Sequence, residues 1–349
     1  MKKLLLSLLG LPGVLVFHAA AWDYEGHRTI NELALASLPT NFPAFARTPE
    51  ARGRIAYLGG EPDRWRNVTD TQAGRGLALA HVSGPDHYFD LEDLPPCGLT
   101  PATLPPLRYD FVAAIAQARA AHPERFPAID PAKNSDHTRE LSGFLPWAIA
   151  ENFEKLQSGF SALAALEKFG GTPEEIANAR GNILYVMGVM GHYVGDAGQP
   201  LHTTIYHHGW TSTNNPNHYT MAAGIHSWID GGFFRKTGGL DLKKLSAQIH
   251  PAQPLAAAAQ PSGIFATAVQ YLAAQNKLVE PLYALDRDGK LSNRDNRGAE
   301  GRAFLEAQLV KSGQWLGNLW LTAWQTAPED TFLEKQLQDR AAAKADSGE

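Results

Sequence analysis

The chain has 349 residues, of which 44% are hydrophobic, and this is enough apolar material for a substantial core in one large domain or two small ones. Its formal net charge of −5 argues against broad, charge-driven binding of duplex DNA, although bound dications would still create a local positive centre that a nucleic acid could meet. Cys97 is the only cysteine, so a disulfide within the chain is excluded and stability has to come from packing or from metal ions.

The first 21 residues have the layout of a secretory signal peptide. Two lysines precede an apolar stretch over 4–17, and three alanines follow at 19–21. The stretch is too short to span a bilayer comfortably, and it is interrupted by glycine and proline. We therefore expect residues 1–21 to be removed, so that a secreted or periplasmic protein begins at or near Trp22.

The rest of the chain is predicted to be mainly helical. Apolar residues at Ile30, Leu33 and Leu38 fall on one face of a helix over 26–38. Further helices are predicted over 109–121, 146–168, 171–197, 220–235, 262–284 and 299–324. Turn-forming residues indicate loops over 93–107 and 207–217, and residues 336–349 are expected to form a frayed tail. Because convincing strand patterns are absent, the sequence predicts an all-α protein with one helical domain over 22–335.

The predicted helix over 171–197 carries the strongest local signals. Thr172 is a good N-cap, Pro173 suits the first helical position, and Glu174 and Glu175 suit the first turn. The helix then becomes apolar on nearly all sides, which is typical of a buried central helix, and Pro200 ends it.

Two pairs of metal-ligating residue types have helical spacing. His192 and Asp196 are four residues apart, and so are His226 and Asp230, so each pair can share one helix face. A single pair of this kind is often only a surface ion pair. The first pair, however, lies on the helix predicted to be buried, where a carboxylate needs a metal ion or a tight partner. His202 follows this helix directly and is a third candidate ligand.

Further candidate ligands precede this helix. His27 lies five residues after Trp22, whose amine and carbonyl oxygen could chelate a metal once the signal peptide is removed. Asp63 follows with Arg66 three residues later, and His87 comes next. Together these residues form an ordered series of nitrogen and oxygen donors without a thiolate, which suits zinc.

The order and spacing of these donors resemble the trinuclear-zinc nucleases. These are the single-strand-specific nucleases of the S-one/P-one type, which share a superfamily with the zinc phospholipases C. The segment "GDAGQPLH", which contains Asp196 and His202, matches the family string GDxxQPLH. The resemblance extends from Trp22 to about Asp230 and implies a helical domain with long loops around a cleft that holds three Zn²⁺ ions.

The same resemblance implies how the ligands are shared among the three ions. The first zinc would be held by Asp63, His87, His192 and Asp196. The second would be held by His27, by the amine and carbonyl of Trp22, and by a bridging Asp196. The third would be held by His202, His226 and Asp230.

Four residues would act on the substrate in such an enzyme. Asp63 would orient the attacking water, and Arg66 would hold a phosphate oxygen. Tyr88 stands where the nucleases place a stacking aromatic, and Asp90 where they place a carboxylate that faces a base edge. The structural alternatives are a surface salt bridge for Arg66, a core position for Tyr88 and a helix cap for Asp90.

The sequence thus predicts an exported zinc-dependent phosphodiesterase. The favoured substrate is single-stranded DNA or RNA, cleaved by an endonuclease to 5′-phosphorylated products, with 3′-nucleotidase activity as an addition. The alternatives are a zinc phospholipase C that acts on phospholipid head groups and a non-catalytic zinc-binding protein. No stable protein partner is implied. The chain departs from the family at Cys97, which has no partner, and in the segment over 203–219, which affects the prediction of the substrate.

Overall fold

Helices dominate the part of the chain that can be described. The structure is a computed structural model that describes residues 22–67, 76–294 and 298–347, so the expected signal peptide lies outside the described residues. It is 68% helical, and within the described ranges the only β-structure is an isolated bridge between Phe89 and Gly143. The prediction of an all-α fold is therefore confirmed. None of the helices within these ranges is both long and apolar enough to cross a bilayer.

The α-helices follow one another with short 3-10 turns between some of them. Their bounds are α1 (Tyr24–Ser37), α2 (Pro49–Leu58), α3 (Glu61–Asn67), α4 (Leu77–Ser83), α5 (Arg108–Ala121), α6 (Leu145–Lys168), α7 (Pro173–Gly198), α8 (Ile225–Ser227), α9 (Phe233–Lys236), α10 (Leu242–Ser246), α11 (Gly263–Asn276), α12 (Val279–Arg287), α13 (Ala299–Gln325) and α14 (Thr331–Ser347).

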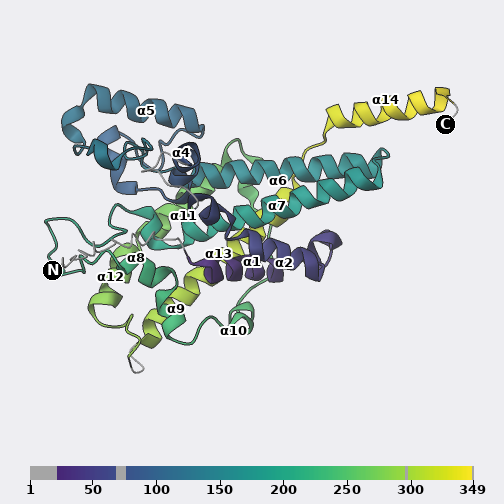
Figure 1. Ribbon diagram of the computed structural model, residues 1–349. Helices are drawn as coiled ribbons and strands as arrows, with labels where there is room; N and C mark the ends of the chain where they lie inside the picture. The colour runs from purple at the N-terminus through teal and green to yellow at the C-terminus, as the bar shows by residue number, and fades with distance from the viewer. Residues whose placement is uncertain (1–21, 68–75, 295–297, 348–349) are drawn as a thin grey trace, which may run out of the picture.

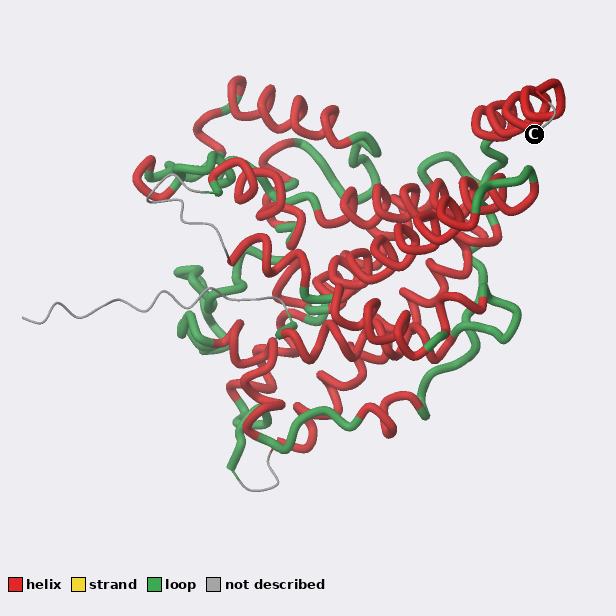
Figure 2. The backbone as a smooth tube through the Cα atoms, turned by 45° about the vertical axis from the view of Figure 1, so that its right-hand side comes forward, coloured by secondary structure: helices red, strands yellow, loops and turns green. Residues whose placement is uncertain are grey.

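The long helices α6 and α7 form an antiparallel pair at the centre of the molecule (Figure 1). Helices α1, α2 and α13 pack against α7, and α11 packs against α6. Helices α4 and α5 lie near one end of the α6–α7 pair, and α14 lies beyond the other end. The tube view shows that the loops run around the outside of the packed helices (Figure 2).

The start and the end of α7 follow the predicted signals. The Glu175 amide donates to Thr172 Oγ1 at 3.1 Å, and the Thr172 amide donates to Glu175 Oε2 at 2.7 Å, which forms a capping box. Pro173 occupies the first helical position, and the helix ends at Gly198, two residues before Pro200. Its second half is buried continuously from Met187 to Gly198, which confirms the predicted central position.

Glycines on α7 allow α1 to pack very closely against it. Asn31 of α1 fills the space beside Gly191, where an added Cβ would overlap the Asn31 side chain. The Asn31 Nδ2 group donates to Ile55 O at 2.8 Å and to Gly188 O at 3.1 Å. This buried amide therefore joins α1, α2 and α7 and sets the position of the first turns of α1.

Two predicted helices differ from the observed ones. The segment 262–284 forms two helices, α11 and α12, with a break at Lys277 and Leu278. Pro281 has no amide hydrogen, so it cannot continue the hydrogen bonds of α11, but it is tolerated in the first turn of α12. The segment 220–235 becomes helical only at Ile225, because its first residues pair with a loop: the Trp210 amide donates to Thr220 O at 2.8 Å.

The C-terminal segment expected to be frayed lies in α14, which is helical as far as Ser347. Leu337 is buried against Ala165 and Leu166 of α6. The Arg340 guanidinium donates to both carboxylate oxygens of Glu175. These contacts hold the helix to the far end of the α6–α7 pair.

Candidate metal centre

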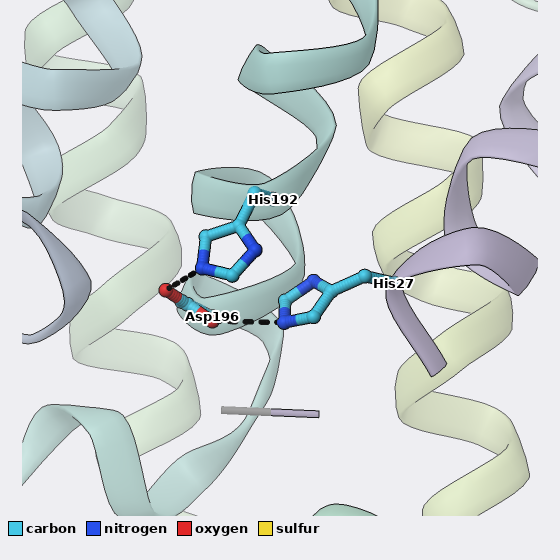
Figure 3. Close-up of side chains that lie close together, drawn as sticks. All are labelled: His27, His192 and Asp196. Carbon is cyan, nitrogen blue, oxygen red and sulfur yellow. Dashed lines mark ion pairs between the residues drawn. The ribbon is translucent and has the colours of Figure 1, made fainter. Parts of the chain in front are cut away.

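The last turns of α7 carry His192 and Asp196, which are both fully buried. His192 Nε2 lies 3.3 Å from Asp196 Oδ2. His27, in the first turn of α1, approaches from the side, with its Nε2 3.4 Å from Asp196 Oδ1 (Figure 3). The rings of His27 and His192 stack with their centroids 3.9 Å apart. The donor atoms of these three residues lie within 4.8 Å of one another and form the first group.

A second group shares His192 with the first. It consists of Asp63 on α3, His87 at the end of a 3-10 turn after α4, and His192. His87 Nδ1 lies 2.9 Å from His192 Nε2 and 3.0 Å from Asp196 Oδ2. Asp196 therefore faces His27 with one oxygen and His87 with the other, which is the position a bridging ligand needs.

The third group consists of His202, His226 and Asp230. His202 lies in the 3-10 turn Pro200–Thr203 that follows α7, and His226 lies in α8. His202 Nε2 is 3.0 Å from His226 Nε2, which is in turn 3.3 Å from Asp230 Oδ2. Asp230 belongs to the π-helical turn Trp228–Gly232, a kind of turn that is frequent at functional sites.

Backbone carbonyls orient two of the imidazoles. His192 Nδ1 lies 2.7 Å from Gly59 O, and His202 Nδ1 lies 2.6 Å from His87 O. A carbonyl oxygen only accepts hydrogen bonds, so each Nδ1 carries a proton and each ring turns its Nε2 towards its group. Metal-ligating histidines are oriented in this way. The second contact also joins the third group to the second.

The charges of the site fit bound cations. Burial lowers the pKa of His27, His87 and His226 well below the ordinary value and that of His202 to about 3, so these rings are neutral. Burial also raises the pKa of Asp230 well above its usual range and that of Asp196 to about 6. Burial opposes protonation of His192 as well, but the carboxylates of Asp196 and Asp63 outweigh it and raise its pKa.

Several donor atoms at the site make no hydrogen bond within the described part of the chain. They include both nitrogens of His27, Oδ1 of Asp196 and Oδ2 of Asp230. Unsatisfied polar atoms are costly in a protein interior, and cations among these atoms would satisfy them. The three buried His/Asp groups could therefore hold metal ions, and all eight side chains predicted as ligands belong to them.

Arg66 and Trp22 lie at the edges of these groups. Arg66 Nη2 donates to Asp63 Oδ1 at 2.8 Å, and the side chain is 21% exposed. Trp22 is fully buried and contacts Phe234, while the amide of the next residue donates to Asp230 O at 2.9 Å. The use of the Trp22 amine as a ligand remains a prediction, because it depends on removal of residues 1–21.

Tyr88 and Asp90 follow His87 along the chain. The Tyr88 side chain is half-buried, whereas Asp90 is buried and its carboxyl pKa is raised by burial and by the charges of Asp93 and Glu92. The Asp90 side chain makes no capping hydrogen bond to the helical turn that follows it within the described residues. The proposed contacts of both residues with a base remain predictions.

Two further histidines lie near the third group, although the sequence places them in a polar loop and favours substrate contact for neither. The rings of His207 and His208 lie with their centroids 5.9 and 5.4 Å from that of His226. Their only sequence signal is a position soon after His202, without helical ligand spacing.

The fold and the site together define an all-α protein with three linked candidate metal-binding groups. No family model matches the chain, and no curated protein matches it.

Proposed function

We propose that this protein is a zinc-dependent phosphodiesterase that cleaves single-stranded nucleic acid. The main support for the proposal is that eight buried imidazole and carboxylate side chains lie together in three linked groups beside an arginine. On this proposal the protein acts after export, with its first 21 residues removed.

The donor set favours zinc and a phosphate ester. Imidazole and carboxylate donors without a thiolate are typical of catalytic zinc sites. When bound, zinc would supply Lewis acidity, which activates water and neutralises phosphate charge. On this proposal the ions would take the ligand sets that the family resemblance implies, in which Asp196 would serve the first two ions.

Two side chains act on the substrate directly. Asp63 presents a carboxylate that orients the attacking water and holds its proton during attack. Arg66 presents its partly exposed guanidinium to a non-bridging phosphate oxygen, because this fork matches phosphate geometry. The hydrogen bond between Asp63 and Arg66 holds the carboxylate and the guanidinium in fixed positions relative to each other.

The half-buried Tyr88 supports a single-stranded substrate. A base can stack on an aromatic ring only when it is free of its own helix stack. A duplex would keep its bases out of reach of this ring. A phospholipid could place its phosphate at the same site. Cleavage of a phospholipid is therefore the competing result in the test below.

The test combines metal content with a choice of substrates. Elemental analysis of the mature protein should show three equivalents of zinc. The zinc-loaded protein should cleave single-stranded DNA much faster than the same sequence as a duplex, and it should leave phosphatidylcholine vesicles intact. A chelator should abolish cleavage, and added zinc should restore it. Release of phosphorylated head groups, without DNA cleavage, would refute the nuclease and identify a phospholipase.

A further inference from the structure

Gln199 lies between α7 and the 3-10 turn Pro200–Thr203, and it is fully buried. Its Oε1 accepts a hydrogen bond from the Leu201 amide at 2.6 Å, and its Nε2 donates to Asp230 Oδ1 at 2.8 Å. The main-chain oxygen of Gln199 also accepts from the His202 amide at 3.0 Å. Gln199 therefore bonds one member of the third group directly and supports the turn that carries another.

The two side-chain contacts fix the direction of the Gln199 amide. A backbone N–H group only donates, so the amide oxygen has to face Leu201. The amide nitrogen then has to face Asp230, and because this nitrogen only donates, Oδ1 of the carboxylate accepts. One of the two oxygens of Asp230 is therefore committed to Gln199.

The other oxygen of Asp230 is left for a cation. Oδ2 makes no hydrogen bond within the described part of the chain, and it lies 3.3 Å from His226 Nε2. A buried carboxylate oxygen without a partner is costly, and a cation beside it would remove that cost. The bond from Gln199 thus determines which oxygen of Asp230 is presented to the third group.

The members of the third group differ in how they are held. His202 Nδ1 lies 2.6 Å from His87 O, whereas His226 Nδ1 makes no hydrogen bond within the described residues. The main chain of Asp230 is fixed by the Asp23 amide, which donates to its oxygen at 2.9 Å. Because one of the two imidazoles lacks an orienting partner, the position of the Asp230 carboxylate matters more to the geometry of this group.

Two further buried glutamines lie in the same core. Gln275 on α11 donates to Gly198 O and to Gln308 Oε1, each at 3.1 Å. Gln308 on α13 donates to Phe304 O at 3.3 Å. Within the described residues neither of them makes a hydrogen bond to any of the eight candidate ligands. They resemble Gln199 in chemistry and burial but not in contact with a ligand, so they offer a matched control.

We propose that Gln199 is a positioning residue for the third cation, which holds Asp230 so that Oδ2 faces the ion and thereby sets the affinity of this group for zinc. The inference rests on the metal binding in the proposed function and adds to it the residue that controls one of the three ions. Removal of a side chain that orients a metal ligand typically lowers metal affinity by about 10- to 100-fold.

Two variants separate the contacts of Gln199. Gln199→Met removes both side-chain hydrogen bonds at nearly unchanged size. Gln199→Asn keeps an oxygen that can cap the turn at Leu201, because asparagine is a favoured cap, but it is one methylene too short to reach Asp230 as well. The milder Gln199→Asn keeps the inference testable if Gln199→Met does not fold, and circular dichroism checks both variants.

The measurement is zinc titration of the mature protein in a competing chelator. The wild type should bind three ions. Both Gln199 variants should bind two of them with unchanged affinity and the third about 10- to 100-fold more weakly. Anomalous diffraction at the zinc edge should place the loss at the group that contains His202. Gln308→Met should keep the affinity for all three ions, although it also removes a buried amide.

Three results would overturn the inference. They are an unchanged third ion in Gln199→Asn, an equal weakening of all three ions, and the same loss of the third ion in Gln308→Met. A wild type that binds no zinc at the third group would overturn it as well. If the wild type binds three ions and the Gln199 variants lose the third, but single-stranded DNA is not cleaved, the proposed function fails and the role of Gln199 stands.

Discussion

The backbone of Gly195 on α7 faces the imidazole of His27 so closely that an added Cβ would lie 2.7 Å from Nδ1. This approach brings His27 to Asp196, one residue further along α7. Glycine at position 195 therefore leaves the space that the His27 ring needs to reach Asp196.

Gly195→Ala should displace His27 from Asp196. We expect the variant to lose one of three zinc equivalents and most of its activity, although alanine favours the helix itself. Zinc content and far-UV circular dichroism are the measurements. Gly181→Ala is the control on the same helix, because a Cβ there meets nothing within 4 Å. It should keep all its zinc, and a full complement in Gly195→Ala would contradict the argument.

Asp63→Asn should abolish turnover while the protein stays folded. The amide has nearly the shape of the carboxylate, but it cannot hold the proton of an attacking water, so we expect kcat to fall by about 100-fold or more. Thermal unfolding and the rate on single-stranded DNA should be measured together. A variant with a near-normal rate would show that Asp63 does not have the assigned role.

The Trp22 amine can be tested by changing the start of the mature chain. A protein that begins at Trp22 should bind three zinc ions, whereas one with an additional alanine before Trp22 should bind one of them weakly and lose much of its activity. The added residue turns the amine into an amide, which is a poor ligand. Titration with zinc in a competing chelator would measure the change, and equal binding by both proteins would exclude the amine.

The lowered pKa of His207 predicts a dependence of stability on pH. Its ordinary value is 6.5 and burial lowers it to about 4 in the folded protein. Between these values the unfolded chain binds a proton at His207 that the folded protein does not bind. The contribution of His207 to stability is therefore fully present above pH 6.5 and is lost as the pH falls towards 4.

His207→Asn removes this contribution. The free energy of unfolding of the wild type should therefore fall more steeply between pH 6.5 and 4 than that of the variant, as measured by denaturant unfolding at a fixed free zinc concentration. His122→Asn, at a histidine that is 45% exposed, should follow the wild type. Parallel curves for His207→Asn and the wild type would rule out this effect.

Much of the fold could be predicted from local patterns. Thr172, Glu175 and Pro200 mark the ends of α7 correctly because caps and proline act within one helical turn. The break between α11 and α12 was not predicted, although Pro281 in the first turn of α12 is a local signal for it. The start of the helical segment at Ile225 depends on the hydrogen bond between the Trp210 amide and Thr220 O. No local sequence pattern reveals that bond.

The amino-acid sequence by itself determined the helical class, the cap and burial of α7, and the pairing of His192 with Asp196 one turn apart, because these follow from contacts within a few residues. Only the tertiary structure decided that His27 and His87 meet opposite oxygens of Asp196, and that His208 stands beside His226. Those contacts join segments far apart in the chain. They depend on how closely the helices pack. That distance is set by residue size at contact positions such as Gly195, which the apolar periodicity does not reveal.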